Sequence, residues 1–128
     1  MNKLENILKE MSLGFFAKGN HKISSKTLFE SKNSVMLDVR SREENESLSF
    51  PLRYQTECIH IPIDEVPDRL SEIPKDKIIG IFCSTGIRAA IVYAFLRTSG
   101  FDKVRIMVGG YEQIVDDLKP AGIWKSLQ

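Results

Sequence analysis

The chain has 128 residues, of which 42% are hydrophobic and 27% charged, with a formal net charge of +1. This length and composition indicate a single globular domain. The balanced charge argues against nucleic-acid binding, and two cysteines are too few for a secreted disulfide scaffold. No apolar run reaches the roughly 20 residues of a membrane span. We therefore expect a cytoplasmic protein with no nucleic-acid or membrane partner.

The N-terminal third begins with an amphipathic pattern. Apolar residues at helical spacing predict a helix over the first dozen residues, formed by Leu4, Ile7, Leu8 and Met11. We take residues 1–20 as a helical extension and residues 21–128 as the domain. Ser24 and Ser25 then predict a capped short helix. An apolar run of strand length follows at 35–39, and the charged stretch 41–49 is either helix or loop.

The remaining elements alternate between strand and helix. The pattern predicts strands at 58–61, 78–82 and 104–108, and helices at 64–73, from about 86 to 99, and at 111–118. Gly100 is well placed as a left-handed helix cap. The run Ile78–Phe82 is the most apolar and predicts a central strand that is buried on both faces. The alternation indicates an α/β fold with a parallel sheet of about five strands and helices on both faces.

Cys83 is the candidate for chemistry. It directly follows the most buried predicted strand, and a helix begins near Gly86, so its thiol lies where α/β sheets bind ligands. Backbone N–H groups and the helix dipole at such a turn favour an anion, here a thiolate. Gly86 supplies a positive φ where the loop needs it, and Arg88 adds a positive charge. A lone cysteine is more often a small buried hydrophobe, but this combination favours a nucleophile.

Four segments resemble one known family. Cys83 to Arg88, CSTGIR, resembles the CxxGxR active-site loop of rhodanese-type sulfurtransferases. The further matches, in the family's order over about residues 21–120, are LDVR at 37–40 with Glu44, the IPI at 61–63, and Gly100-Phe101 with Gly109-Gly110-Tyr111. The loop between the expected second and third strands departs from the family pattern, because RYQTEC at 53–58 replaces the usual GHIPGA. Asn45 and Ile114 stand where the family often has aromatic residues.

The resemblance implies a mechanism and a set of roles. Cys83 would take a sulfane sulfur from thiosulfate or a persulfide and pass it to cyanide or a thiol, without cofactor or metal. The implied substrate-binding residues are Ser84, Thr85, Gly86, Ile87, Arg88 and Arg40, and the implied loop-ordering residues are Asp38 and Glu44. For Asp38 and Arg40 a salt-bridged strand end is an equal alternative, and Arg88 could pair with Glu44 rather than contact substrate. The protein would act on small molecules, as a monomer or dimer.

Other interpretations stay open. A persulfide carrier that serves one partner protein requires the same cysteine, and the N-terminal apolar stripe motivates it. Phosphatases and arsenate reductases use a C-x5-R loop that is one residue longer, so we rank them lower. An inactive regulatory domain usually lacks the cysteine. We interpret Cys58 as a buried structural cysteine rather than a resolving thiol, and His60 as a strand residue. Tyr111 and Trp124 are interpreted as residues that pack or cover an edge.

Overall fold

The computed structural model describes residues 2–128 and contains one parallel sheet of five strands in the order β1-β5-β4-β2-β3. All four pairings are parallel, and β4 and β2 occupy the centre of the sheet. The strands are β1 (Lys22–Ser24), β2 (Ser34–Asp38), β3 (Glu57–His60), β4 (Ile78–Phe82) and β5 (Val104–Val108). The predicted α/β class and parallel sheet are confirmed.

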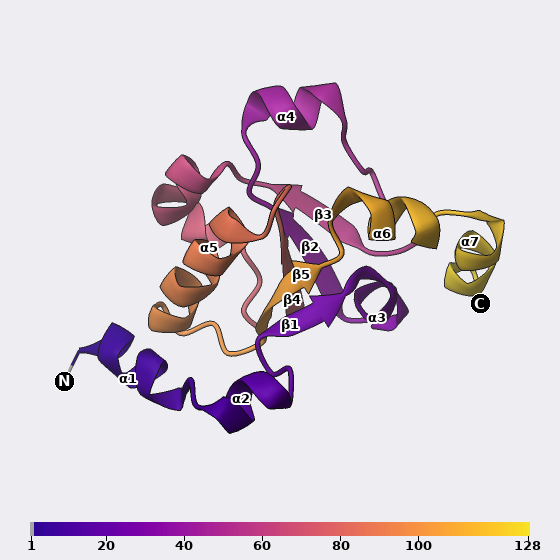
Figure 1. The fold of residues 1–128 in the computed structure, drawn as a ribbon. Helices are drawn as coiled ribbons and strands as arrows, with labels where there is room; N and C mark the ends of the chain where they lie inside the picture. The colour runs from indigo at the N-terminus through magenta and orange to yellow at the C-terminus, as the bar shows by residue number, and fades with distance from the viewer. Residues whose placement is uncertain (1) are drawn as a thin grey trace.

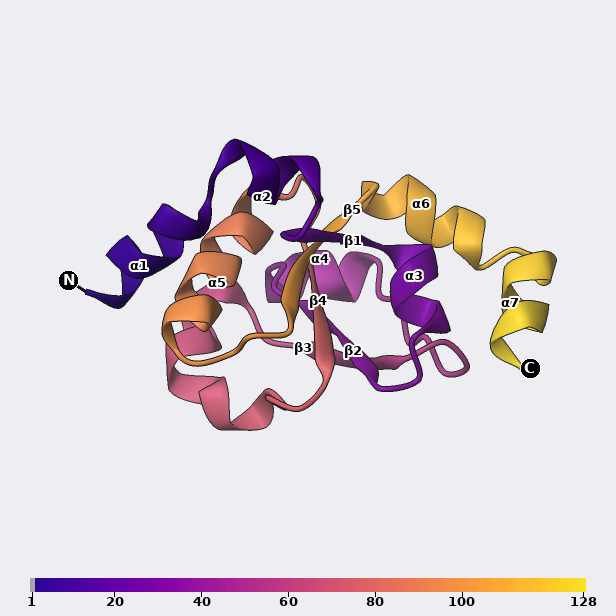
Figure 2. The same ribbon diagram turned by 90° about the horizontal axis from the view of Figure 1, so that it is seen from below.

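Helices cover both faces of the sheet (Figures 1 and 2). One face carries α1 (Lys3–Glu10), α2 (Leu13–Ala17), the 3-10 helix η1 (Ile63–Glu72) and α5 (Ile87–Thr98). The other face carries α3 (Ser25–Glu30), α6 (Gly110–Asp117) and α7 (Pro120–Ser126). The remaining helix, α4 (Arg42–Ser47), lies beyond the carboxyl ends of the strands. No helix in residues 2–128 is long and apolar enough to cross a membrane.

The core is divided between these two faces. On β2, Val35 and Leu37 pack toward α5, whereas Met36 between them packs toward α3 and α6. All three are fully buried, as expected for a parallel strand covered on both sides. In the middle of β4, a Cβ added to Gly80 would lie 2.7 Å from a methyl carbon of Leu28. The absence of a side chain at Gly80 therefore lets α3 approach the sheet closely.

Several local expectations are confirmed or refined. The charged stretch 41–49 contains α4, which Ser41 and Glu44 cap reciprocally at its N-terminus. Gly100 adopts a φ of 89° just after α5. The predicted helix at 64–73 is a 3-10 helix, Ile63–Glu72, with Pro67 inside it and a non-helical backbone at Arg69. Three further elements, α2, β1 and α7, were not predicted from the sequence.

The N-terminal helices are packed onto the domain. Ile7 of α1 is buried, Met11 and Phe15 contact the core cluster on the α5 face, and Arg97 of α5 donates to Glu10 at 2.7 Å. The division of the chain at residue 20 stays a prediction.

Candidate active site

The cysteine loop begins at the carboxyl end of the central strand β4. Asp38 and Phe82 are paired in register, and the N–H of Val39 donates to the carbonyl of Phe82 at 3.0 Å. The strands β2 and β4 therefore end side by side. This arrangement brings the segment after Asp38 next to the loop from Cys83 to Arg88, as Figure 1 shows at the start of α5.

The sulfur of Cys83 accepts two backbone hydrogen bonds from the start of α5. The N–H of Gly86 donates to Sγ at 3.0 Å and the N–H of Ala89 at 3.3 Å. These are groups that a helix N-terminus leaves without intrahelical partners. The Cys83 side chain is buried, with 4% exposure, so the two bonds act in a site with little water. Hydrogen bonds and the helix dipole both stabilise negative charge on sulfur there.

Gly86 is required by the backbone conformation of this turn. Its φ is 89°, in the left-handed region, where a residue with a Cβ is strained. A Cβ added at this position would meet no atom within 4 Å. The requirement for glycine is therefore conformational, and the space above the loop is open.

Arg88 is held by the loop and by α4. Its guanidinium donates to both carboxylate oxygens of Glu44, at 2.6 and 2.9 Å, and to the hydroxyl of Ser84 at 3.0 Å. The hydrogen bond from Arg88 lowers the pKa of Glu44 to about 2. Of the two arrangements that the sequence left open for Arg88, the structure contains the pair with Glu44. The same contacts tie α4 to both ends of the cysteine loop.

Arg40 is completely buried and pairs with Asp38. Its Nη2 donates to Asp38 Oδ2 at 2.7 Å, and its Nε lies 2.9 and 3.1 Å from the two carboxylate oxygens. The rings of Phe50, Phe82 and Tyr111 surround its guanidinium at 5.7, 5.3 and 5.4 Å. Burial alone would lower the pKa of Arg40, but hydrogen bonds to Asp38 and Tyr111 outweigh burial and raise it.

This position of Arg40 favours one of the two sequence interpretations. Its side chain has 0% exposure, and its Nη1 donates to the Tyr111 hydroxyl at 3.1 Å and to the Glu44 carbonyl at 3.4 Å. The predicted contact between Arg40 and a sulfur donor is therefore not available in this conformation. Arg40 instead forms a salt-bridged strand end that supports α4.

The other predicted residues lie around the loop mouth. Thr85 and Ile87 are exposed, the latter to 68%, and Ser84, Gly86 and Arg88 are half-buried. Sequence reasoning missed Phe50, Ala89 and the contact of Tyr111 with Arg40. Of these, only Tyr111 could have been predicted to lie near the site, because it directly follows the double glycine at the end of β5.

Cys58 and His60 lie on the edge strand β3, which β2 separates from β4 and the cysteine loop. Burial raises the pKa of the Cys58 thiol to about 12, which makes it a poor nucleophile. The Nε2 atom of His60 is 2.8 Å from the carbonyl of Arg40, so this ring fixes the backbone after β2. Among residues 2–128, no group of three or more His, Cys, Asp or Glu side chains is placed to hold a metal ion.

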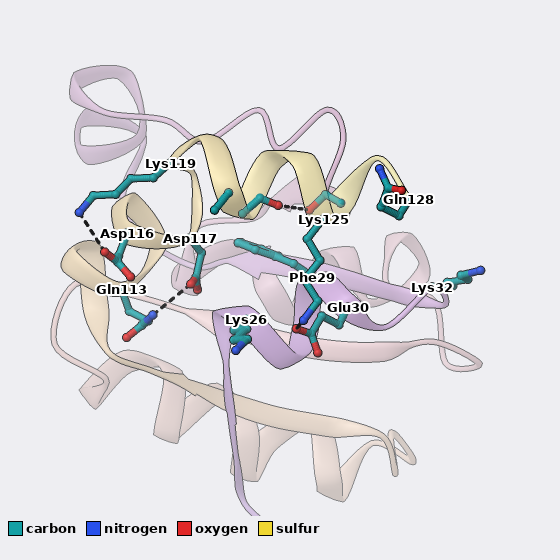
Figure 3. Close-up of a pocket in the computed structure, with 13 residues that line it drawn as sticks. Lys26, Phe29, Glu30, Lys32, Gln113, Asp116, Asp117, Lys119, Lys125 and Gln128 are labelled. Carbon is teal, nitrogen blue, oxygen red and sulfur yellow. Dashed lines mark hydrogen bonds and ion pairs between the residues drawn. The ribbon is translucent and has the colours of Figure 1, made fainter.

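A separate cavity of about 870 Å³ lies between α3, α6 and α7. Figure 3 shows Phe29 at its apolar part and charged side chains around it, several of them paired. Glu30 binds Lys125 at 2.6 Å, and Asp116 binds Lys119 at 3.0 Å. The cysteine loop contributes no residue to its lining. This cavity is therefore separate from the Cys83 site.

A thiol that accepts hydrogen bonds from helix N-terminal amides at the carboxyl edge of a parallel sheet is an arrangement that suits a nucleophilic cysteine on an α/β fold. Comparison with known families specifies this class further. The family model described as "Rhodanese-like domain" matches residues 24–117. The chain belongs to the rhodanese-like domain family, and the resemblance seen in the sequence is confirmed.

Relatives and solved structures agree with this assignment. The chain is 29% identical over 86 residues to a sulfurtransferase from Allochromatium vinosum, covering 67% of this chain and 76% of that protein. It is 32% identical over 75 residues to a tRNA sulfurtransferase from Psychromonas ingrahamii, covering 59% of this chain but only 15% of that protein. The crystal structure of a rhodanese-related protein from Thermoplasma volcanium has a TM-score of 0.64 and 27% identity, covering 78% of this chain and 95% of that one.

Proposed function

We propose that this protein is a sulfurtransferase that carries sulfane sulfur as a persulfide on Cys83. The observation that carries the proposal is the pair of N–H groups, from Gly86 and Ala89, that converge on the Cys83 sulfur. Such donors stabilise a thiolate before the reaction and a negatively charged persulfide after it. The mechanism needs neither a metal nor a cofactor. We place the protein in the cytoplasm, where thiols stay reduced.

In the proposed reaction the Cys83 thiolate attacks the outer sulfur of thiosulfate or of a persulfide. The bond between that sulfur and the rest of the donor breaks, and sulfite or a thiolate leaves with the bonding electrons. A thiol or cyanide then attacks the outer sulfur of the Cys83 persulfide and regenerates the thiolate. This is covalent catalysis in two half-reactions, for which ping-pong kinetics are expected.

A second candidate is a carrier that delivers persulfide sulfur to one partner protein. Exposed apolar side chains at Ile87, Ile91 and Phe95 lie four residues apart on α5, and the first of them belongs to the cysteine loop. A similar segment within a much longer tRNA sulfurtransferase also favours a role in sulfur relay. Slow turnover with small thiols, combined with fast single-turnover transfer to a protein, would support the carrier over the enzyme.

Intact-protein mass spectrometry after incubation with thiosulfate, and separately with a persulfide, tests the proposal. Wild-type protein should gain the mass of one sulfur, and cyanide or a reductant should remove it. Cys83→Ser should gain none, whereas Cys58→Ser serves as the matched control and should gain as much as wild type. A full adduct on Cys83→Ser would refute the assignment of Cys83.

A further inference from the structure

The arginines around the cysteine loop are all engaged with carboxylates. Arg88 binds Glu44 through two hydrogen bonds, and Arg40 is buried against Asp38. On α4, Arg42 donates to both carboxylate oxygens of Glu65, each at 2.7 Å. Each pair neutralises the positive charge that an anionic donor would need at the loop.

The remaining charge at this edge of the sheet is negative. The strands β2 and β5 flank β4, so the segments at their carboxyl ends (residues 38–48 and 108–112) adjoin the loop. The segment after β3 (residues 61–65) lies one strand further out, where Glu65 pairs with Arg42 of α4. Together with the loop they contain three arginines but seven carboxylates: Asp38, Glu43, Glu44, Glu46, Asp64, Glu65 and Glu112. A thiolate on Cys83 adds one more negative charge. A dianion that approaches this edge therefore meets repulsion.

The mouth of the loop also offers apolar surface. Ile87 is 68% exposed and lies between Gly86, which binds the sulfur, and Arg88, which is paired with Glu44. Thiosulfate has no apolar part that could use this contact, whereas the organic part of a thiol persulfide does. Burial of a methylene against such a side chain is favourable. Charge and apolar surface therefore select the same kind of donor.

We propose that Cys83 takes its sulfur from an organic persulfide of low charge, and that thiosulfate is a poor donor. This inference rests on the proposed persulfide chemistry at Cys83 and names its substrate class. The thiolate attacks the outer sulfur of R–S–SH, the S–S bond breaks, and R–S⁻ leaves and takes up a proton from water. Cys83 is left as Cys–S–SH, so atoms and electrons balance without an added oxidant or reductant.

The test compares the rate of sulfur loading of Cys83 by two probes, thiosulfate and the persulfide of 2-mercaptoethanol. Loading is stopped at set times and read by intact-protein mass spectrometry. Wild-type protein should load at least about tenfold faster from the persulfide, a difference of about 1.4 kcal/mol in the barrier. Raising the salt from about 0.02 to 0.3 M should accelerate loading from thiosulfate, because screening weakens the repulsion.

Two matched variants separate local from general charge effects. Glu65→Gln removes the carboxylate that pairs with both Arg42 and Arg69. It should speed loading from thiosulfate roughly two- to fivefold at low salt, with little effect on the persulfide. Glu57→Gln removes the same charge at the opposite end of the sheet, where Glu57 pairs with Lys77 at 3.1 Å, and should change neither rate.

Equal loading by both probes, or loading from thiosulfate that falls with added salt, would overturn this inference and leave the proposed function intact. An unchanged thiosulfate rate in Glu65→Gln would likewise overturn the charge argument. Loading by neither probe would refute the proposed function itself, and this inference with it.

Discussion

Removal of the Asp38 charge gives a sharp test of how the site is built. The Asp38 carboxylate accepts hydrogen bonds from the backbone N–H of Arg40 at 3.0 Å, from its guanidinium at 2.7–3.1 Å and from the Asn45 amide at 3.2 Å. Asp38 is 1% exposed and Arg40 is 0% exposed. Asp38→Asn keeps the shape of the side chain but leaves the Arg40 guanidinium buried without a counter-charge.

The expected loss of stability is large. Breaking a buried ion pair by removing one partner costs about 3–5 kcal/mol, because the remaining charge stays desolvated. A domain of this length is stable by roughly 6–19 kcal/mol in total. The aromatic rings around Arg40 reduce the loss somewhat through cation–π attraction. We therefore expect Asp38→Asn to lose about 3 kcal/mol and to unfold on the order of 10 °C lower.

Urea unfolding followed by far-ultraviolet circular dichroism measures this loss. The matched control is Asp116→Asn, which removes the same charge from an exposed pair with Lys119. Exposed pairs contribute about 0–1 kcal/mol, so this control should stay close to wild type. If both variants lost less than about 1 kcal/mol with unchanged m-values, the Asp38–Arg40 pair would not hold this end of the sheet, and the reasoning would be wrong.

Two further predictions concern the loop itself. The Arg88 hydrogen bond lowers the pKa of Glu44 to about 2, so this carboxylate adds stability above its unfolded pKa and loses it as pH falls toward 2. The melting temperature of Glu44→Gln should therefore fall less steeply than that of wild type between about pH 4.5 and 2, and parallel curves would contradict this. Gly86→Ala should lose about 1–2 kcal/mol and slow sulfur loading of Cys83, because φ is 89° at this residue. Gly14→Ala in α2, where the added Cβ approaches only Ser12 Oγ at 3.7 Å, should leave loading unchanged.

The strands that the sequence predicted are those with strong apolar patterns. The run at 78–82 is buried at four of its five residues and forms β4. By contrast, β1 is only Lys22–Ser24, with one apolar residue, and it exists because it pairs with β5. The helix α7 buries no residue, so it left no apolar pattern to detect. Local signals therefore predicted the elements of the core and missed those at its edges.

At the site, the sequence indicated which residues meet but not how deeply they are buried. The strand end placed the Asp38 segment beside the presumed site of Cys83, and the family resemblance suggested the pair of Arg88 with Glu44, which the structure contains. The burial of Arg40 depends on Phe50, Phe82 and Tyr111, which come from three separate segments. No local sequence pattern predicts that these three side chains surround Arg40. Both interpretations of Arg40 therefore stayed open until the structure was known.

These contacts form one continuous series from the buried sheet to the cysteine loop. Asp38 fixes Arg40, Arg40 donates to the Glu44 carbonyl, and the Glu44 carboxylate holds Arg88 beside Ser84. The loop is therefore positioned from α4 as well as from α5, and its N–H groups already point at Sγ in the protein alone. Donors that are fixed in advance need no reorganisation when negative charge develops on sulfur. The carboxylates that hold the arginines in this arrangement are also the groups that would repel a dianionic donor.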